Sequence, residues 1–121
     1  MIVFCDKNGR AAFWVADNTR LIDVRGKSHG LVEGSDVFDF SGQHRGWYID
    51  GLLRDEGGRV VAFWSDLRSA PNSPVLPILH LPFPAEPVPE VFPTKPVFSV
   101  SPIAPQLHLD WSNLSPLEWL P

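Results

Sequence analysis

Large apolar residues in the first half of the chain recur at fixed distances from four turn signals. Each signal is an Asp-x-x-Gly tetrapeptide, in which aspartate favours the start of a type I turn and glycine accepts the positive φ at its end. The four glycines lie 17, 16 and 16 residues apart. The copies are Asp6–Gly9, Asp23–Gly26, Asp39–Gly42 and Asp55–Gly58.

Apolar residues flank every turn at positions −5 and +5 from its glycine. In a hairpin whose aspartate pairs with the residue after the glycine, these two positions share one face. Short turn-like linkers at 17–19, 33–35 and 50–51 separate the hairpins. The pattern predicts an all-β fold of four β-hairpin repeats with pseudo-fourfold symmetry around one shared core. The flanking residues are Phe4, Leu21, Val37 and Leu53 before the turns, and Trp14, Leu31, Trp47 and Phe63 after them.

The composition changes sharply after the fourth hairpin and divides the chain into residues 1–66 and 67–121. All 13 prolines fall in the second segment. Closely spaced prolines exclude regular helix and central strand and favour extended backbone. The segment is too rich in apolar side chains for an ordinary disordered tail. We therefore expect an extended proline-rich C-terminal strap, packed either on its own hairpins or on a partner subunit.

The end of the chain carries the signature of a helix start. Ser115-Pro116-Leu117-Glu118 fits a capping box with proline at the first helical position. Apolar residues surround this motif, Trp119 and Leu120 among them. The sequence predicts one short helical turn that acts as an apolar terminal clip.

The third and fourth repeats carry a family resemblance. Residues 37–51 (VFDFSGQHRGWYIDG) and 53–63 (LRDEGGRVVAF) resemble the bacterial four-fold beta flower family. The resemblance covers about residues 2–66 and implies four hairpins splayed as petals around a central axis. It implies no particular activity.

The composition of the chain argues against several classes of function. The formal net charge of −4 lacks the basic footprint of nucleic-acid binding. No apolar run approaches the ~20 residues of a membrane-spanning helix, and the N-terminus lacks the pattern of a signal peptide. Cys5 is the single cysteine, which excludes an internal disulfide. We expect a cytoplasmic protein that binds neither nucleic acid nor membrane.

Candidate catalytic and metal-binding groups do not assemble into a recognisable motif. The four turn aspartates could ring a hard cation, but capping of their own turns is the simpler interpretation. By strand parity His29 and His44 fall on opposite hairpin faces, and His80 and His108 are scattered in the strap. Cys5 fits a half-buried strand position better than a nucleophile. The sequence predicts no enzyme activity, no cofactor and no metal.

Aromatic residues offer the remaining binding option. The predicted function is a non-catalytic binding or structural module, which mediates protein–protein contact or self-assembly. The alternative is a protein that binds a small ligand, a sugar or quaternary ammonium compound, on exposed aromatic rings. The Pro-x-x-Pro spacings of the strap are a further, weak docking signal. Candidate surface residues are Tyr48, Trp64, His44, Trp111 and Trp119.

Overall fold

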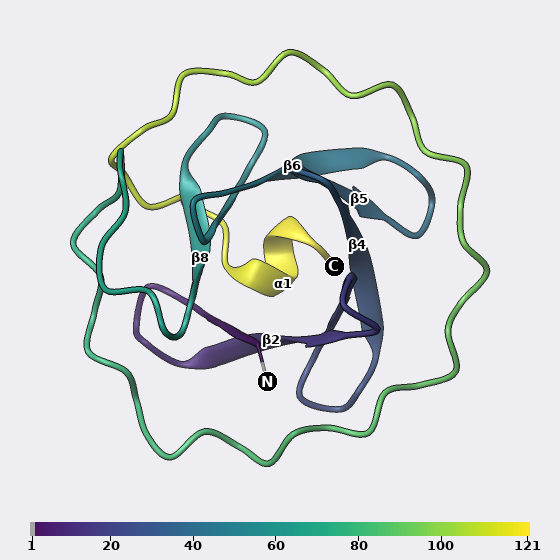
Figure 1. Cartoon of the computed structure of the whole chain (residues 1–121), viewed down its shortest axis with the longest axis horizontal. Helices are drawn as coiled ribbons and strands as arrows, with labels where there is room; N and C mark the ends of the chain where they lie inside the picture. Colours follow the sequence, from purple (N-terminus) through teal and green to yellow (C-terminus); the bar gives the residue numbers. More distant parts are fainter. Residues whose placement is uncertain (1) are drawn as a thin grey trace.

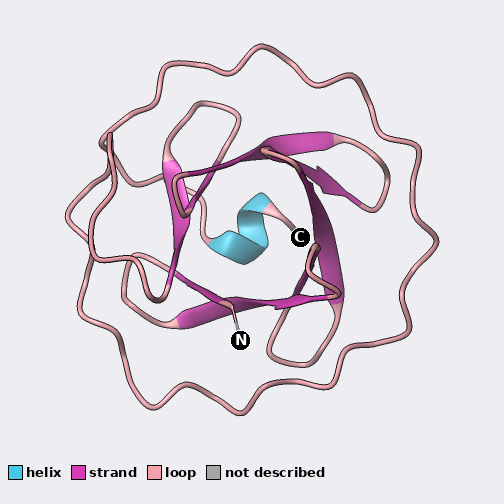
Figure 2. Ribbon diagram, in the orientation of Figure 1, coloured by secondary structure: helices cyan, strands magenta, loops and turns pink. Residues whose placement is uncertain are grey.

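Eight antiparallel strands close into a barrel in up-and-down order in the computed structural model, which describes residues 2–121. Each strand pairs with its neighbours in sequence, and the first pairs with the last (Figures 1 and 2). The predicted all-β fold of four hairpins is confirmed, and closure removes the sheet edges. The elements are β1 (Val3–Cys5), β2 (Ala11–Ala16), β3 (Arg20–Ile22), β4 (Ser28–Glu33), β5 (Asp36–Asp39), β6 (His44–Ile49), β7 (Leu52–Arg54), β8 (Val60–Trp64) and α1 (Pro116–Trp119).

The four hairpin tips form at the predicted glycines. In each tip the aspartate Oδ1 accepts hydrogen bonds from the backbone N–H groups two and four residues later, at 2.8–3.1 Å. The four glycines have φ between 75° and 87°. Each aspartate thus caps its own turn. Among residues 2–121, no group of three His, Cys, Asp or Glu side chains could hold a metal ion.

The prediction that positions −5 and +5 share a face is wrong. Every hairpin contains a β-bulge, which shifts the register so that position −5 pairs with +4. Phe4 pairs with Phe13, and Leu53 pairs with Ala62. Because side chains alternate along a strand, one inserted residue turns position +5 to the opposite face. The −5 residues belong to the inner cluster, whereas Trp14 at +5 belongs to the outer one.

Residues 67–114, the strap, make a circuit around the barrel and cover its outer face (Figure 1). The strap passes all four hairpin tips, and at each tip one of its backbone N–H groups donates to the glycine carbonyl at 2.8–3.1 Å. Three residues before each donor stands a proline, so the strap repeats a Pro-x-x-donor unit once per hairpin. The strap therefore packs on its own hairpins. The units begin at Pro77, Pro87, Pro96 and Pro105 and donate from His80, Glu90, Ser99 and His108.

Residues 115–120, the plug, enter the centre of the barrel (Figure 2). The predicted capping box is confirmed: Ser115 N–H donates to Glu118 Oε1 at 2.9 Å, and Glu118 N–H donates to Ser115 Oγ at 3.3 Å. Trp119 is 3% exposed and Leu120 is fully buried among the inner residues. Gly46 leaves room for the Trp119 ring. The terminal clip predicted from sequence is thus part of the barrel core.

Substitution of a tip glycine should release the strap locally. An added Cβ at Gly42 would overlap the carbonyl oxygen of Val97, whereas one at Gly34 meets no atom within 4 Å, although both residues have positive φ. We expect Gly34→Ala to cost ~1–2 kcal/mol of backbone strain and Gly42→Ala to cost clearly more. Urea denaturation and proteolysis of the strap measure the difference. Equal losses in the two variants would contradict close docking at the tip.

Candidate functional site

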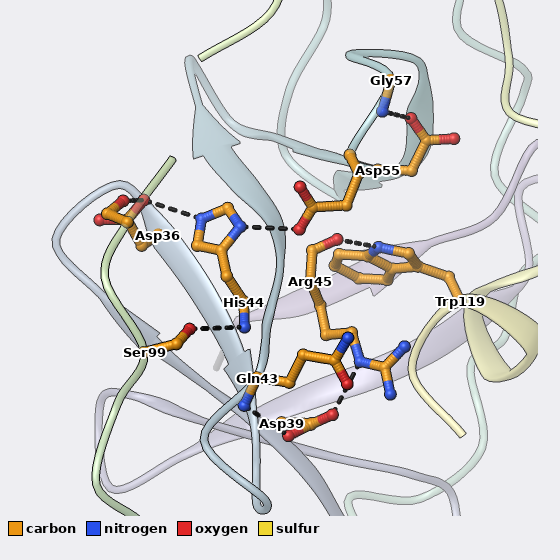
Figure 3. A network of polar contacts seen from close by, with 11 residues as sticks. Asp36, Asp39, Gln43, His44, Arg45, Asp55, Gly57, Ser99 and Trp119 are labelled. Carbon is orange, nitrogen blue, oxygen red and sulfur yellow. Dashed lines mark hydrogen bonds and ion pairs between the residues drawn. The ribbon is translucent and has the colours of Figure 1, made fainter. Parts of the chain in front are cut away.

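A polar network joins the third hairpin, the fourth tip and the strap (Figure 3). Its centre is His44, whose side chain is 5% exposed. The ring Nδ1 lies 2.7 Å from Glu56 Oε1, and Nε2 lies 3.0 Å from Asp36 Oδ1. The strap contributes two hydroxyls: Ser99 Oγ accepts from the His44 backbone N–H at 3.2 Å, and Ser101 donates to Asp36. Both ring nitrogens are therefore engaged.

A second group of this network ties the third tip to the plug. Arg45 Nε donates to Asp39 Oδ2 at 2.7 Å, and the Arg45 carbonyl accepts from Trp119 Nε1 at 2.7 Å (Figure 3). Burial by itself would raise the pKa of Asp39. Hydrogen bonds, from Ser41 and Arg45 above all, outweigh burial and hold this pKa below its usual value. Asp39 therefore remains a carboxylate that orients Arg45.

The side chain of Arg54 holds both ends of the strap circuit. It is 1% exposed, and its guanidinium donates to the carbonyls of Gly58 and His108, each at 2.8 Å, and to that of Asn72. Asn72 lies where the strap begins its circuit and His108 where it ends. Burial lowers the pKa of Arg54 from its ordinary value. Its three acceptors are all backbone carbonyls, so Arg54 closes the ring.

The candidate surface residues lie in different parts of the molecule. Tyr48 and Trp64 are half-buried against the inner cluster, where the Tyr48 ring meets Phe4 edge-on at 5.6 Å. Trp111 packs on the outer face beside Phe63, and Trp119 is in the plug. They and His44 do not form one exposed surface. His29 lies outside the His44 network: it bonds to Asp23 at 2.8 Å and contacts Phe13.

Comparison with known proteins identifies the family. A family model described as "4-fold beta flower protein" matches residues 2–120. The chain belongs to the 4-fold beta flower family. The match extends beyond the expected residues 2–66, so the beta flower sequence pattern includes the strap and the plug. This family is not a known enzyme family. Searches of curated proteins and of solved structures gave no match.

No helix in residues 2–121 of the beta flower chain is long and apolar enough to cross a bilayer.

Sequence reasoning missed two groups that organise the beta flower. The first consists of two buried arginines, each of which binds the strap. Arg54 closes the strap, and Arg20, 3% exposed, bonds to the carbonyl of Glu90 at 2.8 Å and to Asp17 at 2.7 Å. The second is the Pro-x-x-donor repeat. Its units begin 10, 9 and 9 residues apart, a regularity that a search of the strap for repeats could have found.

The outer edge of the strap, here called the rim, is a line of exposed aliphatic side chains. Seven of them are 86–97% exposed. From residue 88 onward they fall on every third position, with Thr94 the one polar member before Gln106. Three residues per turn is the repeat of a polyproline II helix, so one of its three faces points outward. The seven are Val75, Ile78, Val88, Val91, Val97, Val100 and Ile103.

The thiol of Cys5 should be unreactive in the folded protein. Cys5 is fully buried, and burial, with a smaller effect from Asp6, raises its pKa from 9.0 to about 11. We expect no reaction with a disulfide reagent at pH 8 until urea unfolds the chain. The stability that comes from the protonated thiol is present below pH 9.0 and is lost as the pH rises through about 11. Rapid labelling of native protein would contradict this burial.

Proposed function

We propose that this beta flower protein is a non-catalytic module for protein–protein contact, and that the rim is its contact surface. The observation that carries the proposal is the exposure of seven aliphatic side chains along one edge. More extensive exposed apolar surface than usual marks interaction sites in soluble proteins. The proposed setting is the bacterial cytoplasm, a reducing compartment in which the single thiol, Cys5, stays reduced.

The polar groups support a structural role. Both ring nitrogens of His44 face carboxylates, and the guanidinium of Arg54 is engaged by carbonyls. Cys5 is a buried, protonated thiol. A nucleophile or general base must be free to meet a substrate. These groups instead hold the hairpins, the strap and the plug together, which agrees with a scaffold that presents its rim.

A site-specific photo-crosslinker tests the rim in native cells. Benzoylphenylalanine in place of Val100, which is 93% exposed, should give protein adducts that mass spectrometry can identify. The matched control is Leu117, which is 49% exposed but lies on the plug. Adducts at Val100 and none at Leu117 support the rim. Absence of adducts at Val100, or equal adducts at both positions, would contradict the proposed function.

A further inference from the structure

Each nitrogen of the His44 ring faces a carboxylate, although a neutral imidazole has a single N–H group to donate. Nδ1 lies 2.7 Å from Glu56 Oε1, and Nε2 lies 3.0 Å from Asp36 Oδ1 (Figure 3). Ionised carboxylates only accept hydrogen bonds. The two contacts therefore need one proton more than a neutral ring and two carboxylates carry. Imidazole binds a proton more tightly than a carboxylate does, which places this proton on His44.

We propose that this proton is a reversible tie between the third and fourth hairpins. The proposal goes beyond the proposed function, because it concerns how the hairpins are held and not what the rim binds. With the ring protonated, Nδ1–H donates to Glu56 at the fourth tip, and Nε2–H donates to Asp36 in β5. With the ring neutral, one of these contacts is lost.

Glu56 is the carboxylate that leaves when the ring loses its proton. The Asp36 side chain is 24% exposed and also accepts a hydrogen bond from Ser101 of the strap, which holds it in place. The Glu56 side chain is 52% exposed. Because water can replace the ring as its partner, Glu56 turns outward at little cost. The remaining N–H of His44 stays on Nε2 and keeps its bond to Asp36.

The tie lies beyond the backbone ladder that joins the two hairpins. The ladder between β6 and β7 ends at the pair Trp47–Arg54, and His44 lies three residues further toward the tips. A cleft of about 350 Å³ opens there between the third and fourth tips and reaches Trp119 of the plug. Loss of the proton therefore frees the fourth tip from β6 and widens the cleft beside the plug.

The other charged groups near the ring have partners of their own. Arg45 is held by Asp39 at 2.7 Å, and Glu118 accepts from the Ser115 N–H in the capping box. Asp55 accepts from the N–H groups of its own turn. The strap faces His44 with uncharged hydroxyls. Glu56 is thus the carboxylate of the cleft whose position depends on the ring. The charged side chains that line the cleft with His44 are Arg45, Asp55, Glu56 and Glu118.

His29 offers a comparison within the same barrel. Its side chain is 6% exposed, and Nε2 lies 2.8 Å from Asp23 Oδ2. Nδ1 is buried and has no hydrogen-bond partner among residues 2–121. A neutral ring with its N–H on Nε2 satisfies this geometry, whereas a proton added to Nδ1 would be buried without an acceptor, which is unfavourable. Of these two histidines, His44 alone has a second acceptor for its proton.

A pH titration of the full-length protein by NMR tests the tie, because long-range ¹H–¹⁵N spectra report the protonation of each ring nitrogen. We expect both nitrogens of His44 to be protonated at about pH 5, and Nδ1 to lose its proton as the pH rises toward about 8. The Glu56 carboxyl and the Gly57 amide signals should shift with the same midpoint. The contact is thus present at the lower pH and lost at the higher. The signals of His29 should not be coupled to the fourth tip.

Glu56→Gln removes the charge but keeps the shape of the side chain. Since the amide can bond a neutral ring, the variant should weaken proton binding by His44 about threefold or more. The pH-dependent shift at Gly57 should disappear. Glu118→Gln is the matched control: it removes another carboxylate from the same cleft, and glutamine also fits this position of a capping box. It should leave the midpoint of His44 nearly unchanged.

Three results would overturn the proposal. These are a His44 ring with one protonated nitrogen throughout the titration, fourth-tip signals that do not follow His44, and equal shifts of its midpoint in Glu56→Gln and Glu118→Gln. The proposed function is judged separately by the crosslinker at Val100, since the rim and the tie share no residue.

Discussion

Replacement of Arg54 by methionine is expected to open the strap and destabilise the fold by about 3 kcal/mol or more. Methionine keeps much of the buried aliphatic volume but cannot donate hydrogen bonds. The carbonyls of His108 and Asn72 would lose this donor, and the carbonyl of Gly58 would keep only the N–H of His108. A buried carbonyl left unpaired costs ~1–3 kcal/mol. Urea denaturation should show the loss, and proteolysis should cleave the strap at both ends of its circuit.

Arg59→Met is the matched control for this variant. Arg59 lies in the same hairpin, but its side chain is 43% exposed and its ion pair to Asp110 is 3.9 Å long. Exposed pairs of this kind contribute ~0–1 kcal/mol. A loss in Arg54→Met no larger than that in Arg59→Met would show that the strap is held elsewhere and that Arg54 does not close the ring.

Truncation of Trp119 to alanine should cost about 3–5 kcal/mol, the usual range for loss of a buried tryptophan. The ring is 3% exposed at the centre of the barrel, and its Nε1 donates to the Arg45 carbonyl. The variant leaves a cavity among the inner residues of the barrel, a cluster to which every hairpin contributes. Thermal and urea melts measure the change.

Leu117→Ala is the matched control, because it shortens another side chain of the same helix to alanine. Leu117 belongs to the same helix, α1, but is 49% exposed, so its truncation should cost well under the buried value. If the two variants melt alike, the plug is a peripheral clip and not part of the core. If Trp119→Ala alone expels the plug, Leu120 should become exposed as well, and proteolysis of residues 115–121 should accelerate.

The local β-structure of this protein can be predicted from its sequence because its signals are short-range. An aspartate such as Asp6 caps a turn of four residues, and Gly9 accepts the positive φ whatever the rest of the chain does. The capping box from Ser115 to Glu118 is equally local. These signals specify four hairpins and one helical turn, and the repeat spacing indicates their symmetry.

The faces of the hairpins and the partners of the strap depend on tertiary structure. One bulge residue per hairpin moves Trp14 from the expected inner face to the outer one, and a bulge leaves no clear mark on hydrophobic periodicity. The network of His44 joins residues from two hairpins and the strap, and no sequence spacing encodes that meeting. Closure of the barrel brings these segments together. It creates one interior, which Leu120 fills, and one outer circuit, which the strap follows.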